Sequence, residues 1–236
     1  YLYREVLARH FVPLLDYQIV SVLDVGPGIA EIALRPLGRP VAFAPGQFAM
    51  LFLEGIDGWH RHPFTIASSP AESVLRFAIK ALGDDTSRLR EVLRPGMPAV
   101  VGGPFGRFSH QKGTHRQVWI AGGIGVTPFL SWLRALDSQS LRGPVDFFYS
   151  SHSADPPYAE EIKALAGGHN MMRAHVVNSR ERRLTAEEAL ATAGADPDTL
   201  SVFLCGPAGM VSSFCKDFRR AGVASRRIHR EYFDLR

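Results

Sequence analysis

A glycine-rich segment at residues 121–128 offers a clear chemical signal. It reads Ala-Gly-Gly-Ile-Gly-Val-Thr-Pro, comes directly after an apolar run and opens a helix-like stretch. Glycines let the backbone approach a ligand closely, and the amide groups exposed at a helix start attract phosphate. Thr127 can cap such a helix, and Pro128 suits its first turn. The segment is therefore a candidate phosphate-binding loop, and a tight turn without a ligand is the alternative.

A second glycine turn, Cys205-Gly206-Pro207, ends the apolar run 202–205. In a parallel sheet the carboxyl ends of the strands share one edge, where ligands of α/β sheets bind. We therefore expect this turn to lie at the same edge as Gly123 and Gly125. A cysteine is often only a small buried residue, but its place at a strand end before Gly-Pro favours a site.

The tetrapeptide His62-Pro63-Phe64-Thr65 suits a planar ligand. It follows Trp59-His60-Arg61, and its rigid proline presents an aromatic face next to a hydroxyl group. An aromatic face stacks on a flat ring, and the hydroxyl can make one hydrogen bond to it. A phenylalanine packed in a core beside a turn is the alternative.

The first half of the chain alternates apolar residues with a period of two, for example at 48–52 and 75–79. Short alternating segments separated by Pro and Gly predict an antiparallel barrel or sandwich. One helix interrupts these segments, since Asp85 or Thr86 can cap it and Pro95-Gly96 ends it.

From residue 118 onward the pattern changes to continuous apolar runs separated by helix-like stretches. Strands have this pattern when helices cover both faces of a parallel sheet. The runs are 118–121, 145–149, 174–177 and 202–205, and the expected helices are 128–136, 159–165, 185–193 and 208–221. The first of these helices carries an apolar stripe that would face the sheet, formed by Phe129, Trp132, Leu133 and Leu136.

The composition narrows the possible classes of protein. Of the 236 residues, 46% are hydrophobic and 21% are charged, which is the balance of a globular chain and not of a disordered one. The net charge of +4 suits an anionic ligand but is too diffuse to indicate nucleic acid. Two cysteines build neither a disulfide framework nor a Cys-rich metal site, which indicates a reducing compartment. Because no apolar run approaches eighteen residues and no charged-then-apolar segment opens the sequence, we expect neither a membrane span nor a signal peptide in these residues.

Seven motifs occur in a fixed order along the chain. They are Pro45-Gly46-Gln47-Phe48, His62-Pro63-Phe64-Thr65, Gly83-Asp84-Asp85-Thr86, Gly103-Pro104-Phe105-Gly106, the segment 122–128, Cys205-Gly206-Pro207, and Glu231 two residues before Phe233. In this order they resemble the ferredoxin–NADP reductase superfamily, most closely the dehydrogenase domain of membrane ferric reductases and NADPH oxidases. The resemblance covers nearly the whole chain, from about residue 15 to residue 236.

The resemblance implies that the first domain binds FAD. His62 would contact the pyrophosphate, Phe64 would stack on the isoalloxazine ring, and Thr65 would make a hydrogen bond near flavin N5. Pro63 belongs to the same motif. The backbone around further residues would hold the ribityl chain and the pyrophosphate, namely Ile79, Lys80, Gly83 and Thr86.

The resemblance also implies that the second domain binds NADPH, with NADH as a possible substitute. Cys205 would lie near the nicotinamide carbon that gives up hydride, with Glu231 behind it. Phe233 would cover the other flavin face until the nicotinamide displaces it, and together with Thr65 these residues form the implied catalytic set. The remaining implied nucleotide contacts are Gly123, Gly125, Thr127, Pro128, Gly206, Pro207 and Met210.

The preference for NADPH depends on Ser179 and Arg180, which follow the third apolar run. A hydroxyl and a guanidinium at this point match the superfamily's 2′-phosphate site, and arginine fits phosphate in a bidentate geometry. A surface position for Arg180 is the alternative. The sequence departs from the family at Ser150-Ser151-His152, where an arginine is frequent, and this puts one ribose-phosphate contact in doubt.

We therefore expect two domains. The first is an antiparallel β-barrel FAD-binding domain over residues 1–111, of which 1–14 form a membrane-proximal lead-in. The second is a parallel, Rossmann-like α/β NADP-binding domain over residues 112–236. The flavin and nicotinamide rings would meet face to face where the barrel joins the sheet.

In this interpretation NADPH reduces FAD, and single electrons then pass to haem in a transmembrane part of a longer protein. The chain would lie at the cytoplasmic face of the membrane, with no metal of its own and no nucleic-acid partner. A freestanding soluble reductase of ferredoxin or flavodoxin is one alternative. A non-catalytic nucleotide-binding module is another, although the set Thr65, Cys205 and Glu231 argues against it.

Overall fold

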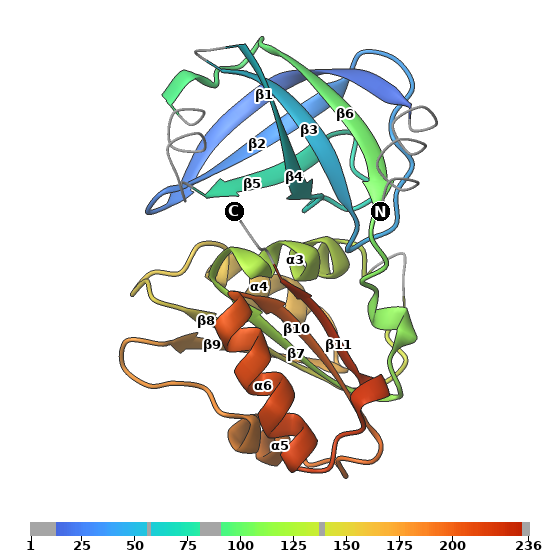
Figure 1. The fold of residues 1–236 in the computed structure, drawn as a ribbon, viewed down its shortest axis with the longest axis vertical. Coiled ribbons are helices and arrows are strands. Elements are labelled where there is room, and N and C mark those ends of the chain that lie inside the picture. The colour runs from blue at the N-terminus through green and yellow to red at the C-terminus, as the bar shows by residue number, and fades with distance from the viewer. Residues whose placement is uncertain (1–12, 56–57, 81–90, 137–139, 233–236) are drawn as a thin grey trace. The chain divides into compact units, whose positions relative to one another are not determined.

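The computed structural model describes residues 13–55, 58–80, 91–136 and 140–232 (Figure 1). It divides into two compact units, each with its own sheet. The first unit contains the described residues of Tyr1–Asp24 and Gly28–Arg107, and the second contains Val25–Pro27 and the described residues of Phe108–Arg236. The main division therefore falls between Arg107 and Phe108, whereas the sequence predicts it after residue 111.

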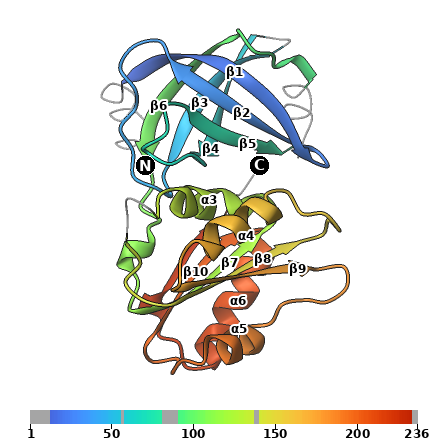
Figure 2. The ribbon, with the colours of Figure 1, turned by 180° about the vertical axis from the view of Figure 1, so that it is seen from behind.

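The first unit is a curled, six-stranded antiparallel sheet in the order β4-β3-β6-β1-β2-β5, as Figures 1 and 2 show from opposite sides. This confirms the predicted antiparallel β-barrel, in a partly open form with β4 and β5 as its edges. Beyond β4, the amide of Ala67 donates to the carbonyl of Arg76 on β5 at 2.8 Å, which links the two edges. The strands are β1 (Leu14–Gly26), β2 (Ile29–Pro36), β3 (Phe48–Gly55), β4 (Gly58–Thr65), β5 (Leu75–Lys80) and β6 (Pro98–Phe105).

The core of the first unit follows from the alternation of its strands. On β5, Leu75, Phe77 and Ile79 are buried. On β3 every second side chain, at Ala49, Leu51 and Leu53, is fully buried. The larger side chains between them lie on the other face of the strand and are partly exposed. Most of the expected helix, including Asp85 and Thr86, lies outside the described residues, but Glu91 and Val92 near its predicted end are helical.

The second unit is a five-stranded parallel sheet in the order β11-β10-β7-β8-β9. Four of its strands match the predicted apolar runs, and they are β7 (Arg116–Gly122), β8 (Val145–Ser151), β9 (Met172–Asn178) and β10 (Leu200–Gly206). The fifth, β11 (Ile228–Tyr232), pairs in parallel with β10 and is not among the strands that the sequence predicts.

Helices cover both faces of this sheet, as the continuous apolar runs predict. Helices α3 and α4 cover one face of the sheet, and α5 and α6 cover the other (Figure 2). Trp119 of β7 packs with α3 and α4, and its neighbours Val118 and Ile120 pack with α5 and α6. The predicted apolar stripe of the first helix is buried throughout. The helices are α3 (Thr127–Arg134), α4 (Ala159–Gly167), α5 (Ala186–Ala193) and α6 (Ala208–Arg220), with short 3₁₀ turns η1 (His110–Lys112), η2 (Gly123–Val126) and η3 (Ser225–Arg227). Within the described ranges, no helix is long and apolar enough to cross a membrane.

A buried carboxylate ties the sheet of the second unit to α5. Asp146 on β8 is fully buried, and its carboxylate contacts Arg116. The same carboxylate lies 3.0 Å from Arg173 Nη2 and 2.9 Å from His175 Nε2. Arg116 also donates to the carbonyl of Ala193, the last residue of α5, at 2.7 Å. Burial alone raises the pKa of Asp146, but the hydrogen bonds from its three partners outweigh that effect and lower this pKa to about 2. Asp146 is therefore an ionised, fully paired structural group.

Candidate functional site

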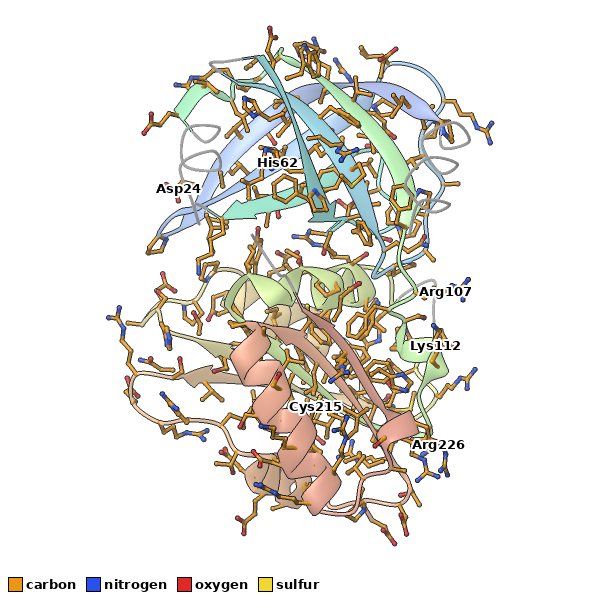
Figure 3. All side chains as sticks on the ribbon, in the orientation of Figure 1. Asp24, His62, Arg107, Lys112, Cys215 and Arg226 are labelled. Atoms are coloured by element: carbon orange, nitrogen blue, oxygen red, sulfur yellow. The ribbon has the colours of Figure 1, made fainter. Side chains whose placement is uncertain are left out.

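The edge strand β4 presents the aromatic residue predicted to stack on a planar ring. Phe64 lies opposite Ala49 of β3, and His62 lies opposite Leu51 (Figure 3 labels His62). Because side chains alternate along a strand, His62 and Phe64 share one face while Pro63 is exposed on the other. Both rings are half-buried, with centroids 5.6 Å apart. An aromatic surface of this kind, left partly open at a sheet edge, can accept a flat ligand.

Thr65, the last residue of β4, carries an unsatisfied hydroxyl. The residue is 4% exposed, and its Oγ1 has no hydrogen-bond partner among the described residues. A buried hydroxyl left without a partner costs about 1–3 kcal/mol, so native proteins seldom keep one without a reason. A flavin ring stacked on the neighbouring Phe64 would supply a polar atom for this hydroxyl. The residues present therefore fit FAD.

Gln47 connects the segments behind Thr65. Its Nε2 donates to the carbonyl of Gly106 at 3.1 Å, and its Oε1 accepts from the amide of Ala44 at 2.8 Å. Its own carbonyl accepts from the amide of Ile66 at 3.0 Å, directly after β4. Two of the sequence motifs, the one that holds Gln47 and the one that ends at Gly106, thus support the end of β4.

The other predicted flavin contacts lie on β5 or outside the described residues. The side chain of Ile79 is fully buried in the core of the first unit, so only its backbone can meet a ligand, as the resemblance implies. Lys80 ends β5 and is half-buried. Gly83, Thr86 and Phe233 lie outside the described residues.

The predicted phosphate-binding segment has the strand–turn–helix form, with a 3₁₀ turn inserted before the helix. After β7, the turn η2 begins at Gly123, which has φ +53° and open space where a Cβ would stand. A Cβ on Gly125 would lie 2.5 Å from the carbonyl oxygen of Cys205, so only glycine permits this close approach to β10.

The prediction that Thr127 caps the helix α3 is wrong. Because η2 places Val126 in the helical region before α3, Thr127 is already the first helical residue, and α3 has no side-chain cap. Thr127 Oγ1 instead donates back to the carbonyl of Ile124 at 3.1 Å. Pro128 lies in the first turn of α3, as predicted.

The two glycine turns lie against each other at the carboxyl edge of the sheet. A Cβ on Gly206, which has φ +156°, would lie 3.0 Å from Gly122 Cα and 2.7 Å from Met210 Cε. Met210 also lies directly over Gly122. The structure thus brings together predicted contacts from β7, β10 and the start of α6, which Pro207 precedes.

Cys205 and Glu231 are direct neighbours in the pairing of β10 and β11. Cys205 is fully buried, and burial raises the pKa of its thiol well above the usual value, with the charge of Glu231 adding to the effect. Burial also raises the pKa of the Glu231 carboxyl to about 7. The thiol is therefore neutral near pH 7, and this chemistry suits a positioning role better than a nucleophilic one.

The predicted 2′-phosphate residues lie at the ends of β8 and β9. Ser179 Oγ donates to the carbonyl of Ser151 at 3.0 Å and also makes a hydrogen bond with His152 Nδ1. Arg180 is exposed, and its guanidinium has no partner among the described residues, whereas Arg182 pairs with Glu188 at 2.6 Å. The contact of His152 with Ser179 was not predicted. The order of the strands could have indicated it, because the loops after β8 and β9 are neighbours.

Known proteins resemble the chain in sequence and in fold. A family model described as an FAD-binding domain matches residues 22–212. This chain belongs to that family, within the ferredoxin–NADP reductase superfamily. Ferredoxin–NADP reductase B from Sorangium cellulosum is 30% identical over 244 residues, which cover 93% of this chain and 97% of that protein. A ferredoxin–NADP⁺ reductase from Neisseria gonorrhoeae, solved with bound FAD and NADP, has a TM-score of 0.78 at 18% identity and covers 93% of this chain and 98% of that one.

Membership of this family defines the general activity. The chain is an FAD- and NAD(P)-dependent reductase that transfers electrons, and FAD and the nicotinamide nucleotide are its cofactors. In the part of the chain that the structure describes, no group of three His, Cys, Asp or Glu side chains could hold a metal ion. NADPH oxidase 4 from Rattus norvegicus is 31% identical over 137 residues, which cover 50% of this chain and 23% of that protein.

Proposed function

We propose that this chain takes hydride from NADPH onto FAD and passes electrons singly to an acceptor. The observation that carries the proposal is the buried hydroxyl of Thr65, which has no hydrogen-bond partner among the described residues, next to the half-buried ring of Phe64. When bound, NADPH supplies a hydride and FAD accepts it and can release the electrons one at a time. The residues of the chain act by placement, because hydride transfer depends on the orientation of the two rings.

On the flavin side, Phe64 supports one face of the ring and Thr65 donates a hydrogen bond to its edge. His62 lies one step further along the same face of β4, where an imidazole can bind the anionic end of the cofactor. The Gln47 contacts with Gly106 and Ala44 hold the loops behind Thr65, so the hydroxyl keeps its position before a ligand arrives.

On the nucleotide side, Gly123 and Gly125 leave the backbone of the β7 turn open to a pyrophosphate. The neutral Cys205 thiol and the carboxyl of Glu231 lie next to this turn on β10 and β11, and they position the nicotinamide. Arg180 and Ser179 contact the 2′-phosphate, and the exposed guanidinium of Arg180 makes NADPH the preferred donor.

An anaerobic titration tests the proposal. The purified chain is mixed with FAD and separated from free flavin, and its absorbance is followed while NADPH and then NADH are added. We expect retained flavin and rapid bleaching by NADPH, with slower bleaching by NADH. A chain that retains no flavin, or a bound flavin that neither nucleotide bleaches, contradicts the proposal.

For the acceptor we propose haem in a transmembrane part of a longer protein, which would place this chain at the cytoplasmic face of a membrane. The supporting observations are the motif His62-Pro63-Phe64-Thr65 and the similarity of half of this chain to NADPH oxidase 4. The test is the full-length gene product, in which haem should be present and should be reduced by NADPH when FAD is bound. A gene without upstream membrane helices excludes this acceptor.

A freestanding ferredoxin reductase is the second candidate. It is favoured by the similarity to ferredoxin–NADP reductase B from Sorangium cellulosum, which covers 97% of that protein. Cytochrome c reduction by the isolated chain, with and without a small iron–sulfur protein, distinguishes the two. A strong stimulation by the iron–sulfur protein supports the free reductase.

A further inference from the structure

A third ring lies in line with the two that are predicted to bind flavin. His60 stands two residues before His62 on β4, so the alternation of the strand puts His60, His62 and Phe64 on the same face. The rings of His60 and His62 are nearly parallel, at 15°, with centroids 6.3 Å apart. We call these three side chains the β4 ring row. The residues between them, Arg61 and Pro63, are exposed on the opposite face.

A glycine on the neighbouring strand leaves room for His60. A Cβ on Gly55 of β3 would lie 2.9 Å from His60 Cδ2 and 3.2 Å from its Nε2, so the imidazole occupies space that a side chain at position 55 would take. The ring is half-buried, yet neither of its nitrogens has a hydrogen bond or an ion pair with any described residue. His60 is thus held in the row with its polar atoms available to a ligand.

The order of the chemical groups along FAD matches the order of the three side chains in the β4 ring row. FAD consists of a planar ring, a ribityl chain, two phosphates and adenosine, in that sequence. With the ring at Phe64, the cofactor that follows β4 towards Gly58 meets His62 first and His60 second. Same-face side chains on a strand are about 6–7 Å apart, so the two imidazoles meet successive parts of the extended cofactor. We propose that His60 binds the adenosine-side phosphate of FAD and thereby selects FAD over FMN, which lacks that phosphate. This inference rests on the proposed function.

The alternative for His60 is a structural role in the strand. A structural role would affect both flavins equally, because both carry the ring and the first phosphate. A phosphate contact affects FAD alone. The ratio of the dissociation constants for FMN and FAD therefore separates the two roles, and it does so even if the variant is somewhat less stable.

The experiment titrates the complete chain, freed of flavin, with FAD and separately with FMN, and follows flavin fluorescence. We expect His60→Ala to weaken FAD binding at least about tenfold and FMN binding less than about twofold, as the loss of a hydrogen bond to a charged group implies. Arg61→Ala is the matched control, because that neighbouring cation lies on the other face of β4. We expect the control to leave the ratio unchanged.

Two results would overturn the inference while leaving the proposed function intact. One is a His60→Ala variant that binds FAD as tightly as the wild type, and the other is an equal loss for FAD and FMN. If the wild-type chain binds no FAD at all, the proposed function fails first, and the wild-type titration alone reveals this.

Discussion

Cys205 and Glu231 lie directly opposite each other on neighbouring parallel strands, at the edge of the sheet where the two glycine turns meet. The two groups share a buried environment that disfavours charge. Burial, with the charge of Glu231 adding to it, holds the pKa of the thiol high, and burial brings the pKa of the carboxyl to about 7. Because the Glu231 carboxyl titrates near neutral pH and the Cys205 thiol stays neutral, the net charge at this edge of the sheet can change within the pH range in which an enzyme works.

Glu231→Gln should stabilise the chain at alkaline pH. The folded pKa of about 7 lies above the usual 4.5, so the stability contributed by protonated Glu231 is complete below about pH 4.5 and is lost as the pH rises through 7. At pH 8 the free energy of unfolding of the variant should be about 1–2 kcal/mol higher than that of the wild type, and at pH 4 the two values should differ little. Urea unfolding across this range measures the effect. Glu187→Gln, at an exposed position on α5, is the control, and an equal gain in both variants would contradict the assignment.

Thr65→Val should separate stability from activity. Valine removes a buried hydroxyl that has no hydrogen-bond partner among the described residues. The free energy of unfolding of the flavin-free chain should therefore stay unchanged or rise by up to about 1 kcal/mol. Reduction of bound FAD by NADPH should slow by about 10- to 100-fold, because the hydrogen bond to the flavin is lost. Stopped-flow absorbance and thermal unfolding give the two measurements. Thr65→Ser, which keeps the hydroxyl, should restore most of the rate, and equal rates in all three proteins would remove Thr65 from the site.

The sheet of the second unit could be predicted because its three inner strands, β7, β8 and β10, are buried on both faces, which leaves a local signature in the sequence. The runs that became β7, β8, β9 and β10 are apolar almost throughout. The edge strand β11 lacks that signature, since three of its five residues are His229, Arg230 and Glu231. Its pairing with β10 is a tertiary contact that no local pattern encodes.

The candidate site was predictable only where its chemistry is local. The tetrapeptide that ends at Thr65 and the glycines of residues 122–125 are each contained in one short segment. The contact of His152 with Ser179 joins residues 27 positions apart, and it depends on β8 and β9 being neighbours. Thr127 was misassigned for a similar reason, because the 3₁₀ turn before α3 is shaped by the close approach of Gly125 to β10.

Asp146→Asn should destabilise the second unit strongly. The neutral side chain would leave Arg116 buried without its charged partner, which costs about 3–5 kcal/mol. The folded pKa of Asp146 lies below the usual 3.8, so its contribution is present above about pH 4 and is lost as the pH falls towards 2. Chemical denaturation at pH 7 and at pH 3 should show a smaller pH dependence in the variant. Asp217→Asn breaks an exposed pair with Arg220 and should change stability by less than about 0.5 kcal/mol. A similar effect of both variants would argue against the buried network.

Arg180→Ala should weaken the use of NADPH and leave the use of NADH unchanged. The guanidinium of Arg180 is exposed and unpaired among the described residues, so its removal breaks no side-chain hydrogen bond or ion pair with any of them, and a loss of activity reports on the ligand. If Arg180 binds the 2′-phosphate, the variant should lose about 1–3 kcal/mol of transition-state stabilisation with NADPH, as measured by kcat/KM. Most of this loss should appear as a higher KM. Arg183→Ala removes another exposed arginine from the same loop and should change neither nucleotide. An equal loss with NADPH and NADH in the Arg180 variant would show that the residue binds a group common to both, and the 2′-phosphate assignment would then be wrong.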